Sequence, residues 1–137
     1  IVRRSAFLEV RGFHEAFGSG GEEALVAIDL ARKGWNLAYI DTLTSHHHPS
    51  QIRNMRPRRI EGVSDRLWTA WLRRSPGHVA SLTLGAVLSA LSSGEQRSGL
   101  FRAIRGLPWV IRERDLIPSE LERQIEMLEA QLEEEKG

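Results

Sequence analysis

The chain has 137 residues, no cysteine and a formal net charge of +1, with 41% hydrophobic and 27% charged residues. These values fit one globular domain with its own core, and they exclude disulfides and thiolate zinc sites. No stretch has the length and purity of a membrane span or of a secretory signal. Because the chain begins at Ile1 without a methionine, we expect a fragment of a longer protein.

The small net charge hides an uneven distribution. Residues 53–74 hold seven arginines and two acids, whereas residues 120–136 hold seven glutamates and two basic residues. The basic middle indicates an anionic partner, and the acidic tail is typical of a solvated helix face. We predict no nucleic-acid binding, because the basic stretch lacks an interleaved platform of stacking aromatics.

The first fifty residues predict two helices and a strand. A short helix is expected over residues 5–10, with Gly12 as its stop, and a second over residues 22–33, closed by Gly34. The glycines of residues 18–21 favour a turn before that second helix over a phosphate-binding loop. Asp29 is notable because most of its helix is apolar. Residues 35–40 then predict a strand.

Two groups in this region carry chemistry. Glu22 and Glu23 open the second helix, and His46, His47 and His48 follow the strand. Carboxylates can take a proton and neutral imidazoles can bind a divalent ion, so the pattern is typical of a metal-assisted active site. The acids could instead only complement the helix dipole, and the histidines could form a polar loop. The residues alone leave both interpretations open.

The rest of the chain predicts helices. Residues 61–74 place Trp68 and Trp71 at core spacing, and residues 76–92 follow the cap Ser75. The latter helix is apolar on most sides, so it is buried, packs on a partner or rests at a membrane surface. We expect another helix over residues 95–105 and a turn over residues 106–110. The tail from Ser119 predicts an amphipathic helix whose apolar residues have coiled-coil spacing over two heptads, fewer than the three or four that indicate a coiled coil: Leu121, Ile125, Leu128 and Leu132.

The first fifty residues resemble a known family. The segments that carry the resemblance are Arg4-Ser5-Ala6-Phe7, Arg11-Gly12-Phe13-His14, Glu22-Glu23, Gly34-Trp35, residues 37–40 and the histidine cluster. In this order they are similar to the C-terminal half of the catalytic domain of family 2 glycosyltransferases, and the later part looks like a bacterial subgroup of that family. Arg11 and His14 replace a common Gly and Asp, and Glu23 replaces a common Asp.

The resemblance implies a fold and a domain plan. The fold class expected is α/β, with a partial GT-A sheet of the nucleotide-diphospho-sugar transferase type followed by a mainly α-helical region. Residues 1–50 would be the acceptor-side part of the GT-A domain, residues 51–118 a helical extension, and residues 119–137 an acidic amphipathic tail. The donor-binding half would lie upstream of Ile1.

The same resemblance implies an activity. It is inverting transfer of a sugar from a nucleotide-sugar donor to a saccharide or lipid-linked acceptor, in polysaccharide biosynthesis. Glu23 would be the general base, Glu22 would position the acceptor, and His47 would meet a Mg²⁺ or Mn²⁺ ion. His46, His48 and Arg53 would contact the donor diphosphate or the acceptor. We expect the isolated fragment to be inactive, and the protein to be cytoplasmic, with contact to the inner membrane face left open.

An alternative from another class is a non-catalytic, mostly helical interaction module. Its acidic tail would pair with a partner helix or with the basic middle. Self-association through the C-terminal helix is compatible with either hypothesis.

Overall fold

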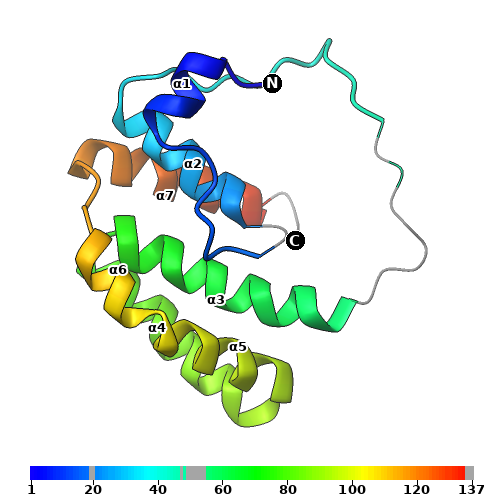
Figure 1. Cartoon of the computed structure of the whole chain (residues 1–137), viewed down its shortest axis with the longest axis vertical. Coiled ribbons are helices and arrows are strands. Elements are labelled where there is room, and N and C mark those ends of the chain that lie inside the picture. Colours follow the sequence, from blue (N-terminus) through cyan, green and yellow to red (C-terminus); the bar gives the residue numbers. More distant parts are fainter. Residues whose placement is uncertain (19–20, 47, 49–54, 135–137) are drawn as a thin grey trace.

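Seven helices and no strand form over the residues that the computed structural model describes, which are 1–18, 21–46, 48 and 55–134. The helices are α1 (Arg4–Glu9), α2 (Glu22–Arg32), α3 (Met55–Arg73), α4 (Pro76–Ser92), α5 (Gly94–Arg105), α6 (Leu107–Glu113) and α7 (Ser119–Glu134). Figure 1 shows α3 crossing the centre of the molecule, with α2 above it and the α4–α5 pair below.

Local sequence signals set the ends of several helices. Gly34 follows α2 with φ of +85°, and its amide donates to the Ala31 carbonyl at 2.9 Å. This left-handed stop is the conformation that glycine adopts most readily. Ser75 begins α4 by accepting a hydrogen bond from the His78 amide. The helices predicted over residues 5–10, 22–33, 76–92 and 95–105 are confirmed within two residues.

The main core lies along one side of α3. Its buried residues come from four helices: Leu25 of α2, Leu67, Trp68, Trp71 and Leu72 of α3, Ala103 of α5 and Val110 of α6. The two tryptophans are 4% and 7% exposed, so the prediction that they belong to the core is confirmed. Helix α5 approaches α3 closely at Gly99, where a Cβ atom would lie 2.5 Å from the Val63 Cβ.

The predicted strand over residues 35–40 is wrong for the described chain. These residues have irregular backbone, and no strand among the described residues lies beside them. Leu37, Tyr39 and Ile40 are 54%, 92% and 50% exposed. A strand satisfies its amides and carbonyls only through a neighbouring strand, so an apolar run without one gains nothing from strand geometry. The α/β fold class with a partial GT-A sheet is therefore replaced by an all-α arrangement.

Two predictions in the helical part also need correction. The segment expected to be a turn at residues 106–110 begins helix α6, in which Pro108 lies in the first turn. Proline is tolerated there because the first amides of a helix have no partner within it. Helix α3 begins at Met55 and not at residue 61, where the apolar spacing predicts its start. The arginine-rich residues 56–59 therefore belong to the helix.

Candidate functional site

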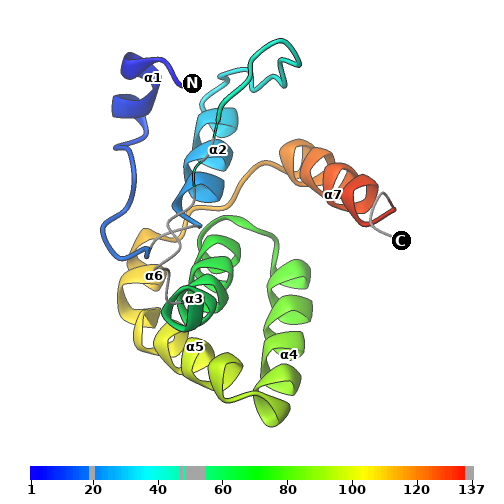
Figure 2. The same cartoon turned by 90° about the vertical axis from the view of Figure 1, so that its right-hand side faces the viewer.

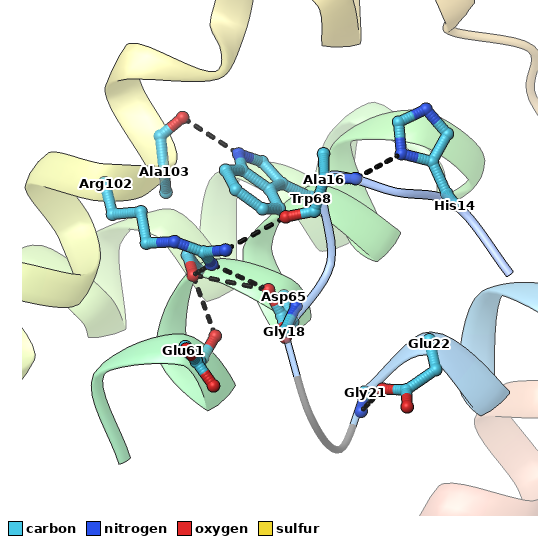
Figure 3. A network of polar contacts seen from close by, with 11 residues as sticks. His14, Ala16, Gly18, Gly21, Glu22, Glu61, Asp65, Trp68, Arg102 and Ala103 are labelled. Carbon is cyan, nitrogen blue, oxygen red and sulfur yellow. Dashed lines mark hydrogen bonds and ion pairs between the residues drawn. The ribbon is translucent and has the colours of Figure 1, made fainter. Parts of the chain in front are cut away.

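A buried ionic network joins α3, α5 and the loop before α2 (Figure 3). The Asp65 side chain of α3 is 1% exposed, and its Oδ1 lies 2.9 Å from Nη1 of Arg102 on α5. The other guanidinium nitrogen, Nη2, donates to the Ala16 carbonyl at 2.9 Å. The Gly18 amide donates to Oδ2 of Asp65 at 3.2 Å. One carboxylate and one guanidinium thus fasten three segments.

Burial raises the pKa of Asp65 above its ordinary value, although Arg102 and the Gly18 amide act in the opposite direction. A carboxyl with a raised pKa is often a catalytic acid or base. Here the side chain is almost without solvent contact, and Arg102 packs over the Trp68 ring at 4.5 Å. A substrate could not reach the carboxyl, so the network acts as a structural clamp.

A second set of ion pairs gathers at the C-terminal end of α3. Arg73 makes two bonds with Asp29 of α2, at 2.5 and 3.0 Å. Arg74 is 3% exposed and binds two glutamates of α7, with Nε 3.0 Å from Oε1 of Glu122 and Nη1 2.7 Å from Oε1 of Glu129. Asp29, notable in its apolar helix, thus has an arginine partner, and the acidic tail pairs with the basic middle.

The predicted catalytic carboxylates have different surroundings. Glu22 accepts a hydrogen bond from the Gly21 amide at 2.8 Å, within the first turn of α2. Glu23 is exposed, and no hydrogen bond or ion pair holds its side chain among the described residues. It lines a cavity of about 790 Å³ together with residues of α1, α2 and the segment after Gly34, including Phe7, Phe13 and Trp35.

Residues 41–46 extend away from the helices in Figure 1. His46 and His48 are exposed, whereas His47 and Arg53 lie outside the described residues. Within residues 1–18, 21–46, 48 and 55–134, no group of three His, Asp or Glu side chains could hold a metal ion. The divalent ion and its ligand His47 stay predictions.

A groove of about 650 Å³ lies between α7 and helices α2, α3 and α4. Its apolar lining comes from four helices and includes Ile28, Ala70, Leu82, Ile125 and Leu132. Arg66 and His78 also line it, and both lie near enough to the Glu129 carboxylate to help lower its pKa. The groove therefore combines apolar side chains with the charged or titratable side chains of Arg66, Arg74, His78 and Glu129.

Helix α4 has two apolar faces. Val79, Leu82 and Ala86 pack against the core. On the outer face, four aliphatic side chains at helical spacing are exposed: Leu84 60%, Val87 43%, Leu88 57% and Leu91 77%. From Pro76 to Ser93 the sequence contains no Asp, Glu, Lys or Arg. No helix in the described part of the chain is long and apolar enough to cross a bilayer.

No protein-family model, curated protein or solved structure matches this chain. The geometry described above therefore carries the functional argument. The sequence analysis missed the Asp65–Arg102 clamp, for which the available signal was a lone acid among the core positions of α3. For residues 76–92 it left open burial, packing on a partner and contact with a membrane surface.

Proposed function

We propose that the chain is a non-catalytic helical interaction module that binds a protein partner through the outer face of α4. The observation that carries this proposal is the row Leu84, Val87, Leu88 and Leu91, exposed at spacings of three, four and seven residues on a helix without charges. A surface helix of a monomer normally turns charged residues outward. Contiguous exposed aliphatic side chains instead mark interaction sites.

The chemistry of the face defines the partner. Without charged groups on α4, binding rests on burial of apolar area and on shape, as when an apolar helix face docks against another. We therefore expect affinity to change little with ionic strength. The partner face should be aliphatic and equally poor in charge, because a charge buried opposite Leu88 would find no counter-ion on α4.

The proposal can be tested by photo-crosslinking. With p-benzoylphenylalanine at Leu88, we expect one discrete adduct with a different protein in cells that express the chain. The same probe at Arg112, a side chain that is 74% exposed on α6, should give none. Adding Leu84→Glu and Leu91→Glu should abolish the adduct and leave helicity unchanged, since both residues point to solvent. Adducts with phospholipid alone, or equal diffuse adducts at both positions, would overturn the proposal in favour of membrane contact or non-specific adhesion.

A second candidate is glycosyl transfer with Glu23 as the general base, favoured by the backbone at Arg11 and Gly12. Their φ angles are +63° and +67°, in the left-handed region that favours glycine. The family that the sequence resembles commonly has two glycines at these positions. The exposed Glu23 carboxylate beside a cavity supports the same candidate. In this proposal the donor is a nucleotide-sugar, the acceptor a saccharide or lipid-linked sugar, and the place of action the cytoplasm.

This candidate predicts a specific kinetic effect. In the longest product of the gene, supplied with Mn²⁺ and UDP-, GDP- or dTDP-sugars, Glu23→Gln should lower the release of nucleoside diphosphate by about 10²-fold or more. Glu22→Gln should cost less, because Glu22 bonds the Gly21 amide and a neutral amide oxygen can still accept that bond. Glycosyl transfer would be excluded if no nucleoside diphosphate is released, or if Glu23→Gln and the unmodified protein release it at the same rate.

A further inference from the structure

We infer that α7 pairs with the α7 helix of a second copy of this chain, over the groove beside Arg66 and His78. The inference is independent of α4 and starts from the spacing of the tail. Leu121, Ile125, Leu128 and Leu132 follow one another at four, three and four residues. This is the d, a, d, a order of a heptad seam.

The C-terminal half of the seam is not covered by the chain's own body, whereas Leu121 and Ile125 are half-buried. Leu128 and Leu132 are 59% and 54% exposed. Ile125 and Leu132, the two a positions, line the groove, whereas Leu128 at a d position is not among its lining residues, so the seam runs along the edge of the groove. In Figure 2, α7 projects to one side of the α3–α4–α5 body.

The positions of the glutamates decide which helix fits. In this register Glu122 and Glu129 occupy e positions, and Arg74 of the same chain binds both. The g positions are Gln124 and Gln131, which carry no charge. The other four glutamates of α7 lie at b and c, on the far side from the seam. An acidic helix can therefore meet its own copy without the repulsion that e and g charges produce.

In this pairing the a positions Ile125 and Leu132 of each copy meet the seam of the other copy, and the b and c positions that carry the glutamates face solvent in both copies. A two-fold axis makes the arrangement reciprocal, since each copy supplies an acidic helix and receives one.

Sedimentation equilibrium of the full chain at 1–100 µM tests the inference. We expect a dimer, and we expect Leu128→Glu to raise the dimer dissociation constant at least about 30-fold, as loss of a hot-spot contact does. Met127→Glu is the matched control, because Met127 is 64% exposed but lies at a c position, outside the seam. Leu84→Glu should leave the dimer intact, which separates this interface from the α4 face. Neither leucine supports the chain's own core, so helicity should persist.

Three results would overturn the inference. The first is a monomer throughout the concentration range, which would assign the seam to a different protein or to solvent. The second is an equal effect of Leu128→Glu and Met127→Glu. The third is dissociation of the dimer by 0.5 M NaCl, which would indicate head-to-tail attraction between the acidic α7 and the arginines at the start of α3.

Discussion

Replacing Arg102 with methionine should lower the free energy of unfolding by about 3–5 kcal/mol at pH 7, because it leaves the buried Asp65 carboxylate without its counter-ion. Asp65 is in the middle of α3 and 1% exposed, so it cannot reach water unless the helix leaves the core. The Ala16 carbonyl and the Ser64 hydroxyl also lose a bonding partner. Urea unfolding followed by far-UV circular dichroism measures the loss.

Two comparisons make this prediction specific. Arg105→Met removes an exposed arginine from the same helix, and its effect should stay within about 0.5 kcal/mol. Adding Asp65→Asn to Arg102→Met should recover part of the stability, since the uncompensated charge is then gone. If the double variant is less stable than Arg102→Met, then the ion pair is not what fastens α3 to α5.

The raised pKa of Asp65 fixes the sign of the pH dependence. Between its ordinary value of 3.8 and its raised value in the folded state, the folded protein holds more protons than the unfolded chain. The Asp65 contribution to stability is therefore greatest at low pH and declines as pH rises through this window. Arg102 lowers the pKa of Asp65, so Arg102→Met should raise this pKa further. The pH range over which the stability declines should then extend to higher pH. The variant should consequently lose less stability at pH 4 than at pH 7.

The features that the sequence predicts best are those that depend on residues a few positions apart, such as the ends of helices. Gly34 stops α2 and Ser75 starts α4 through bonds to residues at most five positions away. Local rules describe such bonds fully. The predicted strand after Gly34 failed because a strand depends on a neighbour, and no described segment supplies one.

The sequence predicts the ion pairs of the fold only in part, less well than the helix ends and better than the strand. Asp65 and Arg102 are separated by 37 positions, and no spacing rule pairs an acid of one helix with one of several arginines on another. The attraction between the acidic tail and the basic middle was foreseeable from charge alone. That Arg74, rather than another of the seven arginines, binds Glu122 and Glu129 follows from the packing of α7 beside the end of α3.

A different result is expected for Arg74→Met, because the glutamates that Arg74 binds lie on the terminal helix α7 and not in the middle of the core. Arg74 holds Glu122 and Glu129 by three bonds of 2.7–3.0 Å. Loss of these bonds leaves the glutamates of α7 without a counter-ion. Helix α7 can then move into water, which solvates the carboxylates, whereas Asp65 in the middle of α3 has no such route to water. We expect release of α7 with the α3–α5 core intact. Docking should weaken by at least about 2 kcal/mol, a factor of about 30 in the docking equilibrium.

Hydrogen exchange of the α7 amides measures this release. In a Leu128→Glu background, where pairing of two chains cannot protect the helix, Arg74→Met should speed exchange across residues 122–134 and leave α3 and α5 unchanged. Arg123→Met is the control, because Arg123 is exposed on α7 and, among the described residues, pairs only with Glu120 of the same helix. Equal acceleration in α3 would mean that Arg74 supports the whole fold.

Acid should have the same effect as the Arg74 variant. Hydrogen bonds from Arg74 hold the pKa of Glu129 below its ordinary value of 4.5. The Glu129 contribution to docking is therefore complete above that value and is lost as pH falls through the lowered pKa. This is opposite in sign to the Asp65 effect. Acidification should release α7, while protonation of Asp65 removes the cost of its buried charge and stabilises the packing of α3. Hydrogen exchange at pH 7 and near pH 3, corrected for intrinsic rates, should therefore become faster in α7 and slower in α3.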